Sequence, residues 1–289
     1  MAGNKHRPPR ARWLRRLLLG SLLLGALGGA WGCWLEPQRL VVSERELELP
    51  DWPKPLSGLR VALISDLHIG SPFWDLAALG RLVERCNAEK PDLVLLAGDY
   101  QINDIWGGVF VAAEPIAERL GALKAPLGVF AVLGNHDWWN DGERTRRAFA
   151  AHGIVVLEES VARLELRGSS FYVVGLADQM TRHSDPKAAL AAVPPHAATL
   201  LLVHEPDVFA TFPALGISPT LTLAGHTHGG QVWLPLLGRL VVPSDFGERY
   251  AYGHVVENGR HLFVTSGVGT SMLPVRFLVP PEIALLTLR

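Results

Sequence analysis

The sequence predicts an α/β fold, a layered sandwich of two mixed β-sheets flanked by helices, with one transmembrane helix at the N-terminus. Short apolar runs alternate with helical patterns along most of the chain, which is typical of βαβ units with buried strands. Of the 289 residues, 48% are hydrophobic and 19% are charged, a composition that suits a packed core and excludes a disordered chain. The third observation is an uncharged apolar run over residues 17–35.

The N-terminal region combines a basic segment, residues 1–16, with the apolar run at 17–35. The basic segment holds six Lys and Arg residues and no acidic residue. The apolar run is close to the roughly 20 residues that cross a bilayer core as a helix. Because positive charge stays in the cytoplasm, we expect an uncleaved, single-pass anchor that places the rest of the chain on the outer side of the membrane. A cleaved signal peptide, with a twin-arginine pattern at Arg15-Arg16, is the alternative.

Charge and cysteine content exclude several classes of protein. After residue 16 the chain holds 21 basic and 28 acidic side chains. No nucleic-acid partner is expected, because phosphate-backbone binding needs a Lys- and Arg-rich face. The two cysteines, Cys33 and Cys86, exclude a disulfide scaffold and an all-cysteine zinc site. A bridge between them is not expected, since Cys33 lies in the apolar run and Cys86 in a predicted helix.

The remaining elements follow from apolar spacing and turn residues. Residues 36–58 are predicted to form a linker and a first strand, because partial alternation is followed by three prolines. A single domain is expected over residues 59–289. Apolar residues at helical spacing predict helices around 76–86 and 116–123, and a shorter helix around 207–212. The predicted buried strands are the apolar runs at 59–64, 93–97, 129–133, 154–157, 171–174, 199–203 and 221–224.

The C-terminal part of the chain is richer in strand patterns and is expected to supply the second sheet. Asn258-Gly259 separates two apolar runs and fits a type I′ hairpin. Asp207 is expected to cap the short helix that follows it.

Five of the predicted strands end in side chains that commonly bind metals. In open α/β sheets, ligands bind beyond the carboxyl ends of the strands, so these side chains should converge on one rim. Carboxylate, amide and imidazole groups suit Mn, Fe or Zn, and a pair of such ions can clamp an in-line displacement at phosphorus. A local turn is needed for both Asp66 and His68 to reach the same ion. In strand order, the residues are Asp66 and His68, then Asp99, then Asn135 and His136, then His204, then His226 and His228.

These motifs resemble, in the same order, those of the calcineurin-like metallophosphoesterases. They are Asp66-x-His68, Gly98-Asp99, Gly134-Asn135-His136-Asp137, His204 and Gly225-His226-x-His228. The segment after His228, together with Ser266–Ser271, Pro274 and Arg276, is similar to bacterial membrane-anchored or exported phosphodiesterases of that family. Some of these relatives hydrolyse the pyrophosphate of UDP-2,3-diacylglucosamine.

The resemblance implies two divalent metal ions (Mn, Fe or Zn) and hydrolysis of a phosphodiester or pyrophosphate by a hydroxide that bridges them. The substrates that the resemblance implies include ones that carry a lipid group. One ion would be held by Asp66, His68 and His228. The other would be held by Asn135, His204 and His226. Asp99 would bridge the two ions, and His136 would stabilise the developing charge or protonate the leaving oxygen.

One position departs from the family pattern. Many relatives have an acidic residue three positions after the bridging Asp, where it orients the catalytic His; this chain has Ile102. Asp104 and Asp137 are the candidates to replace it. The serine/threonine-phosphatase branch also has an Arg just after that acid, and none occurs at 100–104, which argues against a protein phosphatase.

Two sets of residues near the predicted rim have two interpretations each. Arg276 is either a substrate-binding residue that holds a phosphate bidentately or a member of a surface ion pair. Trp106, Trp138 and Trp139 contact an acyl chain or the membrane surface, or pack under long loops.

We therefore expect a monomeric, metal-dependent phosphoric ester hydrolase, tethered to the bacterial cell membrane and located on its outer side. A UDP-diacylglucosamine substrate would instead require the cytoplasmic side. The alternatives are a phosphomonoesterase, including a protein phosphatase, and a metal-stabilised envelope binding protein without turnover.

Overall fold

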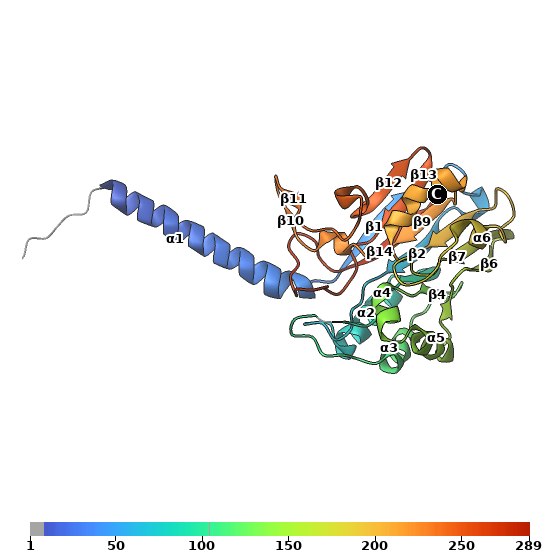
Figure 1. The fold of residues 1–289 in the computed structure, drawn as a ribbon, viewed down its shortest axis with the longest axis horizontal. Coiled ribbons are helices and arrows are strands. Elements are labelled where there is room, and N and C mark those ends of the chain that lie inside the picture. The colour runs from blue at the N-terminus through green and yellow to red at the C-terminus, as the bar shows by residue number, and fades with distance from the viewer. Residues whose placement is uncertain (1–8, 104) are drawn as a thin grey trace, which may run out of the picture.

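Two six-stranded β-sheets pack face to face and form the central layers of the molecule (Figure 1). The computed structural model describes residues 9–103 and 105–289. Helices cover the outer face of each sheet, and a long helix projects from the domain at the N-terminal end. This arrangement is the predicted α/β sandwich.

The first sheet contains both termini of the domain and has the strand order β1-β14-β2-β3-β4-β5. All neighbouring strands are parallel except β14 and β2. Its strands are β1 (Val41–Leu47), β14 (Glu282–Leu288), β2 (Leu59–Ile64), β3 (Leu93–Ala97), β4 (Val129–Val132) and β5 (Val155–Val156). Its outer face is covered by α2 (Leu76–Ala88), α3 (Ala113–Leu120) and α5 (Gly142–Ala151).

The second sheet has the order β12-β13-β9-β8-β7-β6 and a hairpin at each edge. Its strands are β6 (Ser160–Leu166), β7 (Ser169–Gly175), β8 (Thr199–Leu202), β9 (Leu221–Ala224), β12 (Gly253–Glu257) and β13 (Arg260–Val264). Its outer face is covered by α6 (Pro186–Leu190), α7 (Phe212–Leu215) and the 3₁₀ segments η4 (Pro206–Thr211) and η6 (Gly247–Tyr250). A small hairpin, β10 (Trp233–Leu234) and β11 (Gly238–Arg239), stands apart from both sheets.

The burial of the strands explains why the sequence predicted them. In β2, Val61 and Leu63 face the second sheet, whereas Ala62 and Ile64 face α2, and all four are fully buried. A strand with both faces covered has no polar positions, so it reads as a continuous apolar run. Leu63 and Leu95 of the first sheet lie in the same cluster as Phe171 and Leu200 of the second.

Most predicted elements are confirmed. The strands at 59–64, 93–97 and 221–224 have the predicted bounds, and the other predicted strands differ by one to a few residues at their ends. The hairpin at Asn258-Gly259 joins Glu257 to Arg260, and both turn residues have a positive φ (51° and 75°), as a type I′ turn requires. Both cysteines are free, as expected.

Four strands were not predicted: the short β10 and β11, and two strands of the large sheets, β6 and β14. In β6, partly buried and exposed positions alternate in its second half because this strand lies at the edge of the second sheet, so it has no apolar run. Strand β14 lies inside the first sheet between β1 and β2, a position that depends on pairing between the two ends of the domain.

The N-terminal helix is continuous from α1 (Pro9–Ala30) through a π-helical segment, η1 (Trp31–Leu35), and a 3₁₀ turn, η2 (Glu36–Gln38). The stretch Trp13–Gln38 is long and apolar enough to cross a membrane, and only 6% of its most apolar window is buried. By length and composition it is a membrane span or a signal sequence. Residues 1–8 of the predicted basic segment lie outside the described residues.

The prediction of a linker over residues 36–58 needs correction. The expected strand is present as β1, but the remainder packs on the domain: Glu36 and Pro37 are buried, and so are Trp52 and Leu56. The prolines interrupt the strand, but Trp52 and Leu56 join the core between the sheets. A short 3₁₀ turn, η3 (Lys54–Leu56), lies in this segment. No free linker therefore separates α1 from the domain.

Candidate metal centre and active site

The loops after β2, β3, β4, β8 and β9 meet at one edge of the sandwich, as predicted. The contact between the sheets there is direct, because the amide of His226 donates to both carboxylate oxygens of Asp66 (3.1 and 3.0 Å). Within the first sheet, the amide of Asp66 donates to the carbonyl of Gly98 (2.9 Å). Within the second, the amide of Gly225 donates to the carbonyl of His204 (3.1 Å).

Five of the predicted site residues have left-handed backbone conformations. The φ angles are 53° for Asp66, 41° for His68, 57° for Asp99, 68° for His226 and 52° for His228. Such conformations are uncommon for residues with a side chain and cost about 1–3 kcal/mol each. They turn the chain sharply just after each strand. The local turn that Asp66 and His68 require is therefore present.

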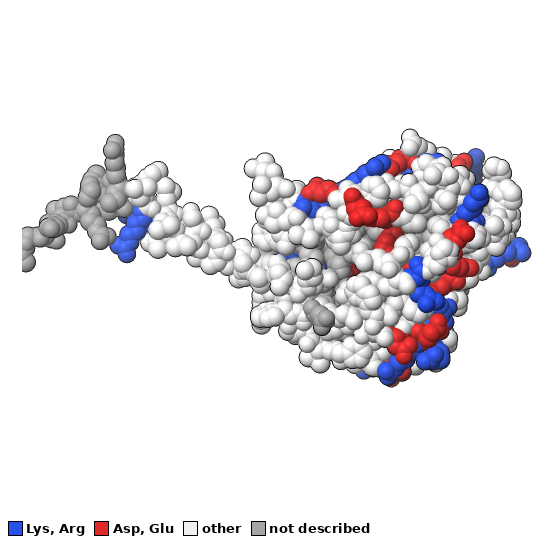
Figure 2. Space-filling view, in the orientation of Figure 1, with Lys and Arg blue, Asp and Glu red and all other residues white. Residues whose placement is uncertain are grey.

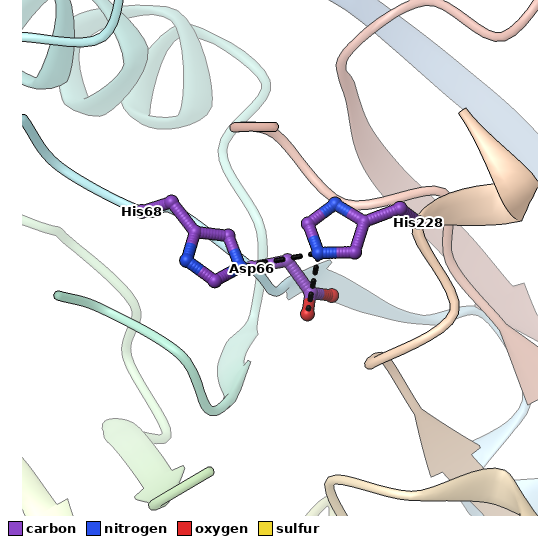
Figure 3. A group of neighbouring side chains, drawn as sticks. All are labelled: Asp66, His68 and His228. Carbon is purple, nitrogen blue, oxygen red and sulfur yellow. Dashed lines mark hydrogen bonds and ion pairs between the residues drawn. The ribbon is translucent and has the colours of Figure 1, made fainter. Parts of the chain in front are cut away.

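A first group of donor atoms is formed by Asp66, His68 and His228 (Figure 3). The Nε2 atoms of His68 and His228 are 3.1 Å apart, and Nε2 of His228 is 3.6 Å from Oδ1 of Asp66. All three side chains are buried. Nitrogen and oxygen lone pairs thus converge from two loops, after β2 and after β9, on a space that solvent hardly reaches, which is the arrangement that a bound cation requires.

A second group surrounds Nε2 of His204. This atom lies 3.2 Å from Oδ1 of Asn135, 3.2 Å from Nδ1 of His226 and 3.3 Å from Oδ2 of Asp99. The other ring nitrogen of His204, Nδ1, is 2.7 Å from the carbonyl oxygen of Ala97. Because a carbonyl oxygen only accepts, Nδ1 carries a proton, and Nε2 is the nitrogen that faces the pocket; Nε2 must be free of its own proton to bind a metal ion.

Asp99 connects the two groups. Its Oδ2 lies 3.6 Å from Nε2 of His68 and 3.3 Å from Nε2 of His204. Its Oδ1 accepts a hydrogen bond from the amide of His136 (2.9 Å), which leaves Oδ2 directed at both groups. The structure thus brings together all seven residues predicted to bind metal. Their oxygen and nitrogen donors fit divalent transition-metal ions.

Burial controls the protonation of the histidines. It lowers the pKa of His68 to about 3 and that of His226 to about 4, and it lowers the pKa of His228 well below the ordinary value. These imidazoles are neutral near pH 7, the form that binds metal.

Burial also affects the pKa values of the acidic side chains and of His204. Burial raises the pKa of Asp66 to about 6. Burial also opposes the charges of His204 and Asp99, but their mutual attraction prevails. The pKa of His204 is raised well above its usual value, and that of Asp99 is lowered well below.

Two glycines allow the loops to approach this closely. Gly98 has a φ of 95°, and a Cβ there would lie 2.6 Å from Nδ1 of His204. A Cβ on Gly225 would overlap the side chain of Ser65. Any larger residue at these positions would push the donor-bearing loops apart.

Asp137 is a functional residue whose role the sequence did not reveal. Its carboxylate is fully buried and accepts hydrogen bonds from the amides of Asp99, Tyr100 and Gly134 (each 2.9 Å). It therefore ties the β3 loop to the β4 loop. The motif placed it next to His136, but both of its oxygens are used by backbone amides. Burial and the nearby Asp99 raise the pKa of Asp137 to about 7.

His136 lies at the mouth of the site, at the start of α4 (Asn135–Asn140). Its ring centroid is 4.7 Å from that of His68 and 4.9 Å from that of Trp139. Unlike most of the ligand set, it is partly exposed. Ile102 is buried, and Asp104 lies outside the described residues.

The expectation for Arg276 needs correction. Its side chain is completely buried, and its guanidinium donates to the carbonyls of Ser266, Gly269 and Val279. It binds no acidic side chain at the surface and extends into the loop behind the site. Its role is to hold the segment 266–279 together, because carbonyl groups that turn inward need donors.

Asp207 also differs from expectation. It accepts hydrogen bonds from the hydroxyl of Ser244 (2.6 Å) and the amide of Asp245 (2.7 Å), and it makes no cap. These bonds hold the wall of a cleft of about 1050 Å³ that opens beside His226. The cleft was not foreseen, since most of its lining, His226 apart, comes from residues outside the predicted motifs. Its walls include Met180, His183, Glu205, Val208 and Phe246.

A two-sheet sandwich with a buried cluster of Asp, Asn and His at its strand ends defines a metal-dependent hydrolase. Comparison with known proteins assigns the family. The model of the calcineurin-like phosphoesterases matches residues 59–230, which include all seven donors. The chain belongs to this family, whose members are metal-dependent phosphoric ester hydrolases.

Three curated relatives share most of their length with this chain. It is 32% identical over 278 residues to the uncharacterized metallophosphoesterase YkuE of Bacillus subtilis (94% of this chain, 95% of the relative). It is 30% identical over 233 residues to the phosphodiesterase YaeI of Escherichia coli (79% and 82%). It is 27% identical over 312 residues to the UDP-2,3-diacylglucosamine pyrophosphatase LpxG of Chlamydia trachomatis (89% and 91%).

The position of Asp137 predicts that Asp137→Asn destabilises the fold and loosens the metal centre. An amide side chain cannot accept at its nitrogen, so buried backbone amides would lose their partner. The free energy of unfolding should fall by about 3 kcal/mol, measured by chemical denaturation of the full chain, and the metal content should fall with it. The exposed Asp51→Asn is the matched control, with a change under about 0.5 kcal/mol. Unfolding of Asp137→Asn at the wild-type denaturant concentration would contradict this role.

Proposed function

We propose that this protein is a membrane-tethered phosphodiesterase or pyrophosphatase that works with two divalent metal ions. The observation that carries the proposal is the position of Asp99. Its Oδ2 faces His68 of one donor group and His204 of the other, both within 3.6 Å. A carboxylate oxygen shared by two donor groups is suited to bridge a pair of cations.

The two groups of donor atoms indicate which residues would bind each ion. Asp66, His68 and His228 would hold one ion; Asn135, His204 and His226 would hold the other; and Asp99 would bind both. When bound, such ions activate water and neutralise charge on the phosphoryl group. Mn, Fe and Zn all suit these donors.

His136 is assigned the proton transfer. Its backbone is held by Asp99, and its ring lies against His68 at the open side of the pocket. A substrate phosphoryl group at the metal centre would therefore present its leaving oxygen on the side of His136. Imidazole suits this role, since its ordinary pKa of about 6.5 allows it to give a proton near neutral pH.

The cleft beside His226 offers room for a second substituent on phosphorus, which a diester or a substituted pyrophosphate has and a monoester lacks. Among the described residues that line it there is no Lys or Arg, whereas Asp185, Glu205, Asp207 and Asp245 are acidic. A monoester dianion gains no cationic partner here. A second substituent on phosphorus would find about 1050 Å³ of space. Two relatives with this layout are named a phosphodiesterase and a pyrophosphatase, which supports the same substrate class.

The tether is assigned to α1. The helix is long and apolar enough to span a bilayer, and basic residues precede the apolar run. By the positive-inside rule, the domain would face the outer side of the cell membrane.

Replacement of the bridging carboxylate tests the two-ion arrangement. Asp99→Asn should lower the turnover of bis(p-nitrophenyl) phosphate by more than about 100-fold, because even partners outside the ligand set typically contribute 10–100-fold. Chelation should abolish the wild-type activity, and added Mn²⁺ should restore it. The control is Asp51→Asn, which should act like the wild type. Turnover near the wild-type level in a folded Asp99→Asn protein would rule out the bridge.

The substrate class is tested by comparing two aryl phosphates. The diester bis(p-nitrophenyl) phosphate should have a kcat/KM at least about tenfold above that of p-nitrophenyl phosphate, which is about 1.4 kcal/mol of transition-state stabilisation. The physical reason is the absence of a cationic partner for a dianion among the described cleft residues. A preference for the monoester would favour a phosphomonoesterase instead.

A further inference from the structure

An uncharged apolar surface surrounds the point where α1 meets the domain. We call it the apolar collar, and it consists of residues 105–110, 233–237 and 271–278. In Figure 1 the β10–β11 hairpin stands beside the end of α1, and in Figure 2 the part of the domain next to α1 is largely free of charged side chains. The large side chains exposed on the collar include Trp106, Phe110, Leu236, Leu237, Met272 and Leu273.

The exposure of these side chains is unusually high for apolar groups. Leu236 is fully exposed, Trp106 is 76% exposed and Met272 is 74% exposed. The segments 105–110 and 233–237 contain no charged residue, and Arg276 in 271–278 is buried. A contiguous apolar surface without charges marks a site of interaction, and Trp is favoured at the membrane interface.

Hydrogen bonds hold the three segments of the collar together. The amide of Trp106 donates to the carbonyl of Met272 (3.3 Å). The side chain of Gln231 donates to the carbonyl of Ser271 (3.1 Å), and the amide of Trp233 donates to the carbonyl of Phe277 (2.9 Å). The collar is therefore one surface built from three loops, with a defined position on the domain.

The foot of the N-terminal helix is attached to the same surface. The amide of Arg276 donates to the carbonyl of Gly32 (2.9 Å), and the amide of Leu278 donates to Oε2 of Glu36 (2.7 Å). A Cβ on Gly32 would lie 3.2 Å from the ring of Phe277, so the helix and the loop are in close contact. A bilayer that surrounds this helix must consequently reach the collar.

We propose that the apolar collar lies in the membrane interface, so that the catalytic domain rests on the bilayer in one orientation. This inference depends on the proposed tether and is independent of the proposed reaction. The occupant of the collar is lipid, because the collar continues the surface of a helix that is itself apolar and unburied. The helical stretch Trp13–Gln38 is about 39 Å long at 1.5 Å per residue, enough to cross a hydrocarbon core of about 30 Å and reach the domain.

The collar loops begin at the metal centre, which gives this orientation a consequence for the substrate. Residue 105 follows Asp99 closely in the chain, and Trp233 follows His228. Before the third segment, a Cβ on Gly267 would lie 2.8 Å from Cβ of Asp66. The metal centre would thus lie just beyond the headgroup layer, where it suits a lipid whose phosphodiester or pyrophosphate projects from the bilayer.

The orientation is measured with a fluorescent probe on the full-length protein in phosphatidylcholine–phosphatidylglycerol vesicles. Leu237→Cys carries a bimane label in a Cys33→Ser background; Cys86 is buried and can remain. The matched control is Val155→Cys, an exposed apolar position on β5, at the sheet edge opposite β1. Quenching is measured with lipids that carry a nitroxide on the acyl chain, after flotation has isolated vesicle-bound protein.

The bimane at Leu237 should be quenched at least about twofold more than the bimane at Val155. Equal quenching in floated protein would overturn the collar and leave the tether in place. Failure to float would overturn the tether and the collar together. The bimane at Leu237 could instead become shielded from water without lipid, to an extent that grows with protein concentration. That result would mean that a second copy of the chain covers the collar, and it would also overturn the proposal.

A paired variant controls for folding. Leu236→Asp combined with Leu237→Asp places charge on the collar away from the donor groups. It should reduce the quenching of a bimane at Met272→Cys toward the control level, while hydrolysis of soluble bis(p-nitrophenyl) phosphate stays at the wild-type rate. Undiminished quenching in this folded variant would contradict a collar that binds lipid as one surface.

Discussion

The shared position of the Asp99 carboxylate is the interaction on which the rest of the site depends. One of its oxygens faces His68 and His204, and the other accepts the amide of His136. This single side chain joins the two donor groups to each other and to the residue assigned to proton transfer. Burial of so many ionisable groups is unfavourable by itself, because each loses contact with water. The compensation comes from mutual attraction, as between His204 and Asp99, and from the neutral state that burial imposes on the other imidazoles.

This arrangement strains the backbone, and the packing of the surrounding structure offsets the free-energy cost of that strain. Five site residues with left-handed φ angles require support from a rigid frame. The support comes from strands that are buried on both faces, and from Asp137, which holds the β3 and β4 loops through their amides. Arg276 performs a similar task in the loop behind the site, where it satisfies inward-facing carbonyls. The same loop then reaches the foot of the N-terminal helix, so the packing that shapes the metal centre also sets its relation to the membrane.

The sequence predicted the parts that depend on local patterns. Buried strands such as β2 read as apolar runs because both faces are covered, and the polar residues at their ends could be assigned to one rim from the topology of parallel sheets. Residues whose role depends on distant contacts were harder. Asp137 looked like a partner for His136, but its burial beneath two loops directs it to their amides. Arg276 looked like a surface or substrate residue, but the loop closes over it. The segment 36–58 was expected to be partly a linker, yet Trp52 and Leu56 are buried between the sheets. The cleft beside His226 is lined mostly by residues outside the predicted motifs, so only the assembled fold reveals it.

In the proposed metal centre, seven side chains from five loops would hold two cations with Asp99 between them. Anomalous scattering at the manganese absorption edge, from crystals of the protein grown with Mn²⁺, would locate these ions. Two peaks should appear about 3.5–4 Å apart, one beside Asp66, His68 and His228, the other beside Asn135, His204 and His226, with an oxygen of Asp99 next to each. A single peak in the fully loaded protein, or peaks remote from Asp99, would contradict this arrangement.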